Sequence, residues 1–335
     1  MKKGTLSCLV MVISAGTMFA QSKTGTSIGQ FLLIEPSARI AGMGNAGVTM
    51  YGEPQSAYYN PAAIGLFYSN GVQFTHSLWL ADIAYDYAVV SVSLEDFGNL
   101  MASVTSLSSG EIDVRTVDKP LGTGERYTVA DLAFGVGYGR RISDRFSVGV
   151  QVNYIQEIIW HSSMSAFALN VGTIYRISED GIHIGASISN FGTRAKFDGR
   201  DLRIQYDQNP NVFGDNNSLP GELFTDDFPL PIIFRVGLGY PVLIGDENTL
   251  TLAVDAFHPS DNTESISMGG EWGYDDIFFL RGGYQNMFLQ DSEVGLTLGA
   301  GLHYMMDTYA VSFDYGWADH GRLESTHRLT IGISF

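Results

Sequence analysis

Three acidic residues and three arginines occupy the same phase of strand-like segments in the second half of the chain. They are Arg235, Asp255, Glu271, Arg281, Asp314 and Arg328. Successive side chains of a β-strand point to opposite faces, so each charge lies opposite the apolar residues of its own segment. If the apolar faces contact lipid, the six charges share one interior with His183 and His303. Charge in a low-dielectric interior is costly unless it is paired, so a buried polar network is predicted.

Two functions are open to such a network. It could form a polar conduit or substrate track, or it could pair internally and tie the strands to the segment that precedes them. We favour the second interpretation. Glu35 and Arg39 are the residues of that preceding segment that we expect to join the network.

Catalysis finds little support in the sequence. The seven histidines are scattered, and none stands at metal-ligand spacing from another histidine or a cysteine. No nucleophile elbow occurs, and the single cysteine, Cys8, lies in a predicted export leader. We therefore predict a protein that is not an enzyme and has no metal site and no cofactor.

Gly42, Gly44 and Gly47 match the G-x-G-x-x-G pattern of dinucleotide-binding proteins. That function needs a strand before the glycines and a βαβ unit around them, but Pro36 interrupts the preceding run and no such unit follows. We predict that the glycines instead allow the backbone to turn and to approach other backbone closely. Asn60, Pro61 and Ala62 then predict a tight turn.

The elements that would position these residues are strands. At the end of the chain Leu329, Ile331, Ile333 and Phe335 alternate with small or polar residues. Similar alternation over about ten residues, the length of a tilted transmembrane strand, recurs along the chain. We predict fourteen such segments: 71–80, 84–94, 99–108, 129–139, 145–158, 164–176, 182–191, 231–240, 248–257, 265–274, 277–285, 294–305, 308–318 and 325–335.

An export signal precedes these segments. Lys2 and Lys3 are followed by an apolar run to Phe19, and cleavage is expected after Ala20. Removing residues 1–20 lowers the net charge from −17 to −19, which argues against nucleic acid as a partner. We predict a signal peptide over 1–20, a plug segment over 21–70 and a barrel over 71–335.

The predicted fold is therefore all-β, a 14-stranded antiparallel transmembrane β-barrel with a small N-terminal plug, in the bacterial outer membrane. Short connections alternate with longer ones, as in barrels with short periplasmic turns and long external loops. Charged residues make up only 16% of the chain and aromatic residues 12%, which suits strands that face lipid.

The predicted loop 192–230 mixes aromatic residues with acids. We expect Tyr206, Phe213, Phe224 and Phe228 to serve protein recognition or to cover the mouth of the barrel. Calcium binding at Asp215, Asn216 and Asn217 is conceivable, but their spacing fits no known loop and solvation is the expected role.

The run Ala38–Ala46, followed by Tyr59-Asn60-Pro61-Ala62, resembles the start of the PorV/PorQ family, which is related to FadL-type fatty-acid transporters. Ser189–Gly192 and Leu280–Tyr284 extend the resemblance. It implies that residues 27–68 fold inside or under the barrel. PorV-type proteins serve the type IX secretion machinery and bind signal domains of exported cargo, whereas FadL-type proteins pass hydrophobic molecules through the barrel wall.

Three functions follow for comparison. We favour a secretion component that binds exported cargo or other secretion components with its external loops. The alternative is a passive transporter of hydrophobic small molecules. A general porin needs a wide channel, for which fourteen strands and a plug leave little room. Outer-membrane lipid is a partner in every case.

Overall fold

The computed structural model describes residues 24–178, 181–209, 211–214, 218–245, 247–289 and 292–335. The predicted signal peptide over 1–20 and the conceivable calcium ligands Asp215, Asn216 and Asn217 lie outside these described residues.

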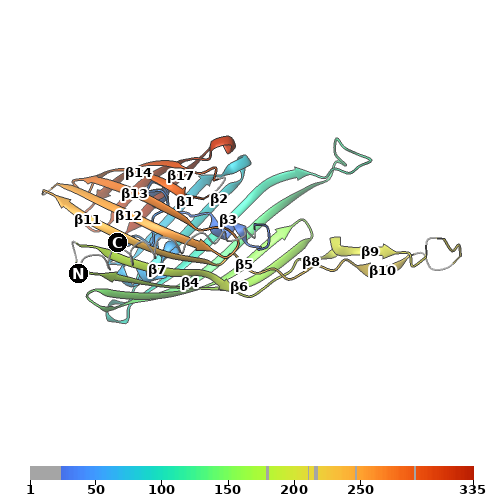
Figure 1. Ribbon diagram of the computed structural model, residues 1–335, viewed down its shortest axis with the longest axis horizontal. Helices are drawn as coiled ribbons and strands as arrows, with labels where there is room; N and C mark the ends of the chain where they lie inside the picture. Colours follow the sequence, from blue (N-terminus) through green and yellow to red (C-terminus); the bar gives the residue numbers. More distant parts are fainter. Residues whose placement is uncertain (1–23, 179–180, 210, 215–217, 246, 290–291) are drawn as a thin grey trace, which may run out of the picture.

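Fourteen strands of the described residues form one closed antiparallel barrel (Figure 1). Each strand pairs with the next along the chain, β7 pairs with β11, and β1 pairs with β17 to close the ring. The strands are β1 (Gly71–Leu78), β2 (Ala84–Ser93), β3 (Asn99–Asp113), β4 (Arg126–Ser143), β5 (Phe146–Ile159), β6 (Ser162–Arg176), β7 (His183–Gly192), β11 (Ile233–Ile244), β12 (Asn248–Pro259), β13 (Ser265–Tyr274), β14 (Phe278–Met287), β15 (Leu296–Met305), β16 (Ala310–Asp319) and β17 (Ser325–Ser334).

The predicted fourteen-stranded fold is confirmed, and most strand ends fall within a few residues of the expected ones. β3 and β4 are the exception, because they run on to Asp113 and start at Arg126 instead of stopping near 108 and 129. The two strands stay paired in this extension, past a register shift between Ser108 and Glu111. Apolar residues alternate only where a strand faces lipid. The part of the β3–β4 hairpin that continues into water therefore lacks this pattern and was not predicted.

The alternation of side chains sets the two faces of the wall. In β1, Phe74 is 46% exposed on the outer face, while Gln73 and Thr75 are 5% and 0% exposed on the inner face. In β17, Ile331 is 47% exposed and Arg328 is 2% exposed. The polar half of each strand thus faces the interior.

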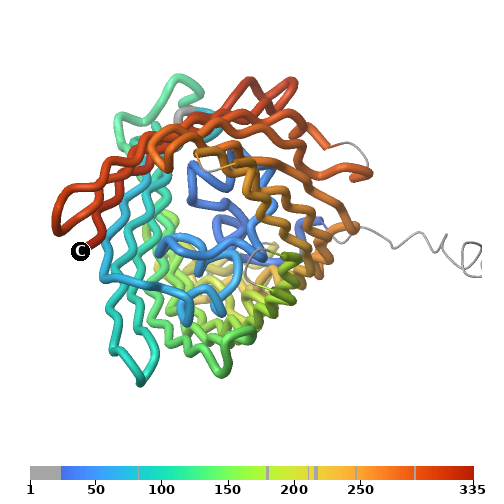
Figure 2. Tube along the Cα trace, turned by 90° about the vertical axis from the view of Figure 1, so that its left-hand side faces the viewer, coloured from blue at the N-terminus to red at the C-terminus, as the bar shows by residue number. Residues whose placement is uncertain are grey.

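The N-terminal segment, defined here as residues 24–70, lies within the ring of strands (Figure 2). It contains η1 (Gln30–Leu33), α2 (Ala38–Gly42), α3 (Ser56–Tyr59) and η2 (Pro61–Leu66). Ser37 caps α2, because its hydroxyl accepts a hydrogen bond from the backbone N–H of Ile40 at 3.2 Å. None of the helices in the described residues is long and apolar enough to cross a membrane.

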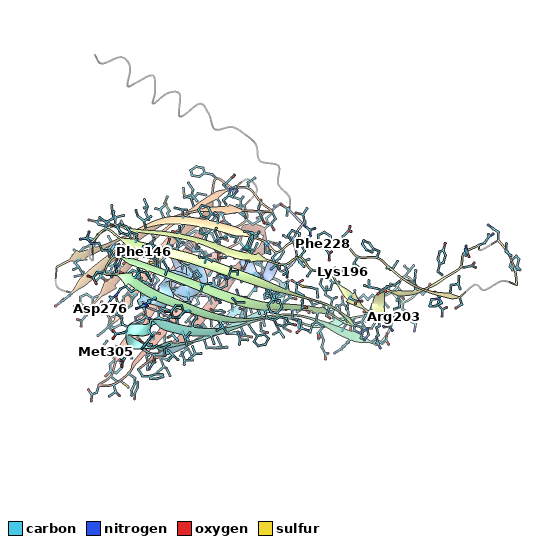
Figure 3. The ribbon with its side chains drawn as sticks, turned by 90° about the horizontal axis from the view of Figure 1, so that it is seen from below. Phe146, Lys196, Arg203, Phe228, Asp276 and Met305 are labelled. Carbon is cyan, nitrogen blue, oxygen red and sulfur yellow. The ribbon has the colours of Figure 1, made fainter. Side chains whose placement is uncertain are left out.

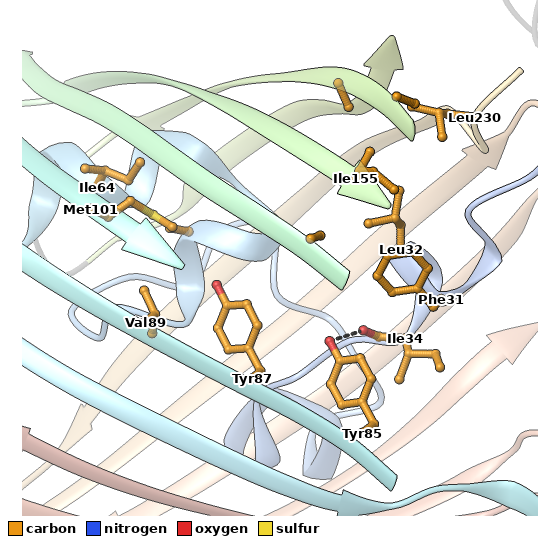
Figure 4. Close-up of a cluster of buried hydrophobic side chains, with 14 of the residues drawn as sticks. Phe31, Leu32, Ile34, Ile64, Tyr85, Tyr87, Val89, Met101, Ile155 and Leu230 are labelled. Carbon is orange, nitrogen blue, oxygen red and sulfur yellow. Dashed lines mark hydrogen bonds between the residues drawn. The ribbon is translucent and has the colours of Figure 1, made fainter. Parts of the chain in front are cut away.

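A buried hydrophobic cluster joins the N-terminal segment to the wall (Figure 4). Phe31 and Ile64 of the segment belong to it together with Tyr85, Met101 and Ile155 of the strands. The Tyr85 hydroxyl also donates to the Ile34 carbonyl at 2.9 Å. Burial of apolar surface therefore fixes the segment in the interior.

The connection between β7 and β11 projects far beyond the barrel (Figure 1). It contains β8 (Asp198–Gly199), η5 (Arg200–Leu202), β9 (Arg203–Tyr206) and β10 (Leu219–Glu222), and β9 pairs with β10. We call residues 203–222 the external hairpin. The short connections η3 (Leu80–Asp82), η4 (Glu95–Phe97) and η6 (Gly321–Leu323) complete the elements. Lys196 and Arg203 lie at the hairpin end of the molecule, and Phe146, Asp276 and Met305 lie at the opposite end (Figure 3).

Candidate functional site

Gly42 and Gly44 lie where the N-terminal segment touches the barrel wall. A Cβ added to Gly42 would come within 2.9 Å of the Gly299 Cα, and one added to Gly44 within 2.7 Å of the Met268 carbonyl oxygen. Gly44 also has a φ of +67°, a conformation that glycine adopts without strain. Gly47 instead contacts its own segment, since a Cβ there would lie 2.6 Å from the Tyr59 ring. At these three positions neighbouring atoms lie so close that only glycine, which has no side chain, fits.

Glycines on the inner face of the barrel wall also leave room for the N-terminal segment. A Cβ at Gly149 would overlap the Pro61 carbonyl oxygen, and one at Gly172 would overlap the Asn60 side chain. Comparable overlaps at Gly269 and Gly283 involve the backbone of Met43 and Gly44. All four wall glycines therefore lie against the segment.

Asn60 hydrogen-bonds in three directions. Its Nδ2 donates to the Val48 carbonyl at 2.7 Å and to the Thr173 carbonyl of β6 at 3.0 Å. Its Oδ1 accepts the Ala62 backbone N–H at 3.0 Å, and Pro61 starts η2. Asn60, Pro61 and Ala62 therefore form the predicted turn and attach it to the barrel.

A chain of ion pairs connects α2 to three strands. Arg39 donates to both carboxylate oxygens of Glu271, at 2.7 and 2.8 Å. Arg281 donates to Glu271 at 2.5 Å and to Asp314 at 2.6 Å, and His303 Nε2 lies 3.4 Å from Asp314. Opposite charges in contact offset much of the cost of burying them, although Arg281 Nη2 and Asp314 Oδ2 have no hydrogen-bond partner.

Arg235, Asp255 and Arg328 form a second set of contacts with the segment. Arg235 lies 3.9 Å from the Glu35 carboxylate, and Arg328 Nε donates to the Glu35 carbonyl at 3.1 Å. Asp255 accepts the Val48 backbone N–H at 2.8 Å. Burial raises the pKa of the Glu35 carboxyl, while Arg235 and Arg328 oppose that rise. The structure thus divides the six predicted lumen charges between two groups, and each group reaches the N-terminal segment.

One small cavity lies between the middle of the segment and the wall. An interior cavity of about 20 Å³ is lined mainly by polar side chains, among them Gln151, Asn153, Asn170 and Arg235. A volume of this size holds about one water molecule. It is far below the roughly 300 Å³ of a small ligand pocket.

The four aromatic residues expected to serve recognition lie in the long external connection. Tyr206, Phe213 and Phe224 are 53%, 98% and 84% exposed. Phe228 differs, because its backbone pairs with Ala195 at the base of the connection and its side chain is 39% exposed. The connection is not an irregular loop, as the sequence suggested, but contains the external hairpin.

Residues 18–211, which are 194 of the 335 residues, match the family described as type IX secretion system protein PorV. This chain belongs to the PorV family. The match covers the N-terminal segment and the strands from β1 to β7. The search of curated proteins returned no match.

Solved structures show the same fold. The Pseudomonas putida toluene transporter TodX aligns with a TM-score of 0.56 and 12% identity, covering 90% of this chain and 98% of that one. The Ralstonia pickettii toluene transporter TbuX gives 0.54 and 11%, covering 90% and 97%, and a Pseudomonas aeruginosa FadL homologue gives 0.53 and 10%, covering 90% and 98%. At such identities the likeness concerns the fold alone.

This PorV-family chain is an outer-membrane β-barrel with the fold of these solved barrels. Sequence reasoning missed the wall glycines that receive the N-terminal segment. Their signal was available, because Gly149, Gly269 and Gly283 stand at the inward phase of their strands, where a small residue leaves room for something inside.

Proposed function

We propose that this PorV-family barrel binds exported proteins at its external end and has no catalytic role. The proposal is supported mainly by one contrast: the interior is occupied by the N-terminal segment, whereas the external hairpin exposes aromatic residues to water. Exposed aromatic side chains grouped on one projection are typical of protein interaction sites.

The acidic charge of the hairpin region favours binding partners that carry basic residues. The external hairpin contains three acids, Asp207, Asp215 and Glu222, and one arginine, Arg203, and two further acids, Asp226 and Asp227, follow it. An acidic surface attracts basic segments of a partner and repels acidic ones, and this attraction weakens as salt rises. A cargo domain with basic residues beside apolar ones fits this surface.

Co-purification tests the proposal. The detergent-solubilised barrel is incubated with the C-terminal signal domain of a type IX cargo protein, and retained domain is measured. We expect the triple variant Y206A/F213A/F224A to retain at least tenfold less, because truncating a few central aromatic residues removes most of an interface energy.

The matched control is V117A/L121A, since these apolar residues are 99% and 96% exposed in the other long external connection. The control should retain the domain as the unaltered protein does. Equal retention by the triple variant, or equal loss in both variants, would contradict binding at the hairpin.

Passive transport of hydrophobic molecules is the second proposal. Its support is the shared fold with toluene transporters. It requires the N-terminal segment to move, because the interior cavity of about 20 Å³ is smaller than any aromatic hydrocarbon. Uptake of toluene into liposomes carrying the barrel, above the rate of empty liposomes, would support transport and count against a purely docking role.

A further inference from the structure

An open groove of about 540 Å³ lies at the external mouth of the barrel. Its walls come from the β3–β4 extension, the end of β5 and the base of the long connection between β7 and β11. Tyr127, Ile159, Phe197 and Leu202 supply apolar lining. Since Leu202 is followed directly by Arg203, the first residue of the external hairpin, a protein bound to the hairpin would lie beside this groove.

The groove faces the inside of the mouth and not the lipid. Side chains two residues apart along a strand lie on the same face. Ile159 therefore shares the face of Ile155, which is 0% exposed, and Tyr127 shares the face of Ala133, which is 5% exposed. Phe197 packs against the interior hydrophobic cluster that contains Ile155 and Ala133. Apolar surface thus continues from the interior cluster into the groove.

Two carboxylates lie one step deeper in the barrel on the same face. Asp131 and Glu157 stand directly opposite each other in the β4–β5 ladder. Glu157 is two residues from Ile159, which at about 3.4 Å per residue places it about 7 Å further in along the strand. Side chains directly opposite each other in an antiparallel pair lie about 5 Å apart, and like charges there repel. The apolar groove therefore leads to a concentrated negative charge.

No cation of the described residues pairs with either carboxylate. Asp131 is only 9% exposed, and no hydrogen bond or ion pair with another described residue holds its side chain. Glu157 accepts the backbone N–H of Gly29 at 2.9 Å. Arg115 lines the groove but is exposed and pairs with neither acid. A nearly buried charge without a partner is costly, so a positively charged ligand would stabilise this pair.

The groove and the acid pair together define the shape of a suitable ligand. The acids on the groove lining already have partners, because Asp113 lies 3.3 Å from Arg126 and Asp201 lies 3.0 Å from His161. The unpaired charge is therefore deep, and the walls above it are apolar. Lysine and arginine side chains match this arrangement, since their stems pack on apolar surface while their charged heads reach polar groups. No group of three or more potential metal ligands occurs in the described part of the chain.

We propose that this groove binds a lysine or arginine side chain of the exported protein that the hairpin holds. The stem packs against Tyr127 and Ile159, and the cationic head donates hydrogen bonds to Asp131 and Glu157. This inference rests on the cargo binding proposed above and adds the point at which the cargo inserts a basic residue. The simpler explanation is that water in the mouth solvates the two acids, in which case the charge of Asp131 has no effect on cargo.

The variant D131N tests the proposal, because asparagine keeps the size of the side chain and removes its charge. Retention of the type IX signal domain by the detergent-solubilised full barrel is measured as above. We expect D131N to retain about threefold less domain or lower still, in line with the loss of one partner of a desolvated charge pair. D118N is the matched control, since it removes one acid from the exposed tip of the β3–β4 connection. It should retain the domain as the unaltered barrel does.

Two further measurements separate binding from a role in folding. The melting temperature of D131N should not fall, because the substitution removes the repulsion between Asp131 and Glu157. A fall would assign the charge to folding and overturn the proposal. Raising the salt concentration from about 0.05 M to about 0.5 M should weaken retention by the unaltered barrel more than retention by D131N, because salt screens the attraction between charges.

The outcomes distinguish this inference from the binding at the hairpin. If D131N and the unaltered barrel retain the domain equally, while the hairpin triple variant loses it, the groove proposal is overturned and the hairpin proposal stands. Equal loss in D131N and D118N would assign the effect to overall charge and would also overturn the groove proposal. No retention by the unaltered barrel would overturn both proposals.

Discussion

The interior contact surface and the external hairpin use the same residue types in opposite ways. Inside, the aromatic residue Tyr59 and the charged residue Arg281 are 0% and 4% exposed and are fixed by close neighbours. On the external hairpin, Tyr206 and Phe213 are 53% and 98% exposed. The interior therefore determines stability, while the hairpin is free to meet a partner.

This difference separates residues that matter for folding from residues that matter for binding. A substitution inside should act on folding and so on every property of the barrel, because buried charges and close backbone contacts have few alternatives. A substitution on the hairpin should leave the barrel intact and change binding alone. The predictions below test that separation.

Breaking the buried ion-pair chain should have the largest effect. R281M leaves Glu271 and Asp314 without the cation between them, and removing one member of a buried pair costs about 3–5 kcal/mol. R126M removes a pair with Glu111 in which both side chains are more than half exposed, at a cost of about 0–1 kcal/mol. Urea unfolding of the two variants in detergent measures both values, and equal losses would show that the interior network does not stabilise the barrel.

Filling the space between wall and segment should come next. In G149A the new methyl group would overlap the Pro61 carbonyl oxygen, and overpacking typically costs about 1–3 kcal/mol. G282A is the control, since the nearest atom to a Cβ there is Leu298 Cδ2 at 4.0 Å. The melting temperature should fall for G149A and stay within error for G282A. A stable G149A would mean that the segment does not need its contact with β5.

Removing the external hairpin should change stability less than either of these substitutions. Replacing residues 203–222 with two glycines keeps Leu202 and Leu223 adjacent, as they are in the structure, where Leu223 N–H donates to the Leu202 carbonyl at 2.8 Å. The free energy of unfolding should change by less than about 0.5 kcal/mol, the usual range for surface changes. A large loss would show that the hairpin supports the barrel and would remove the contrast drawn above.

The barrel could be predicted from the sequence because the alternation of apolar and polar residues along a strand is a local property. Phe74 and Ile331 face outward and Gln73 and Arg328 inward, as their alternation requires. The inward position of the six lumen charges followed from the same rule. Strand count and order therefore needed no knowledge of long-range contacts.

The sequence suggested that Glu35 and Arg39 join the lumen charges, but it did not show which residue pairs with which. Arg39 meets Glu271 across 232 positions of sequence, and Arg281 bridges Glu271 and Asp314 because β13 and β14 are neighbours while Asp314 comes from β16. Likewise, Ile204 and Tyr206 alternate with Arg203 and Gln205 in β9, but four residues are too few to mark the hairpin that β9 forms with β10. The alternation of residues along a strand cannot specify contacts that depend on the N-terminal segment inside the barrel.

The smallest predicted effect concerns His320, which lies in the external connection between β16 and β17. Its Nε2 contacts the Thr326 hydroxyl at 3.0 Å and its ring lies edge-on to Trp79. Burial, helped by the nearby Arg328 and opposed by Asp319, lowers the pKa of His320 to about 4. Folding therefore favours the neutral ring, and its stabilising contribution is complete above the ordinary pKa of about 6.5 and is lost as pH falls towards 4.

H320Q should remove this part of the pH dependence. The glutamine amide can still reach Thr326 but does not titrate, so the melting temperature of the variant should fall less than that of the unaltered barrel between pH 6.5 and 4. The comparison is made in one detergent at constant ionic strength, because other carboxylates titrate in the same range and contribute equally to both proteins. If the melting temperatures of the two proteins fall equally between pH 6.5 and 4, protonation of His320 is tolerated at the external rim. The boundary between the constrained interior and the adaptable exterior would then lie deeper in the barrel than this connection.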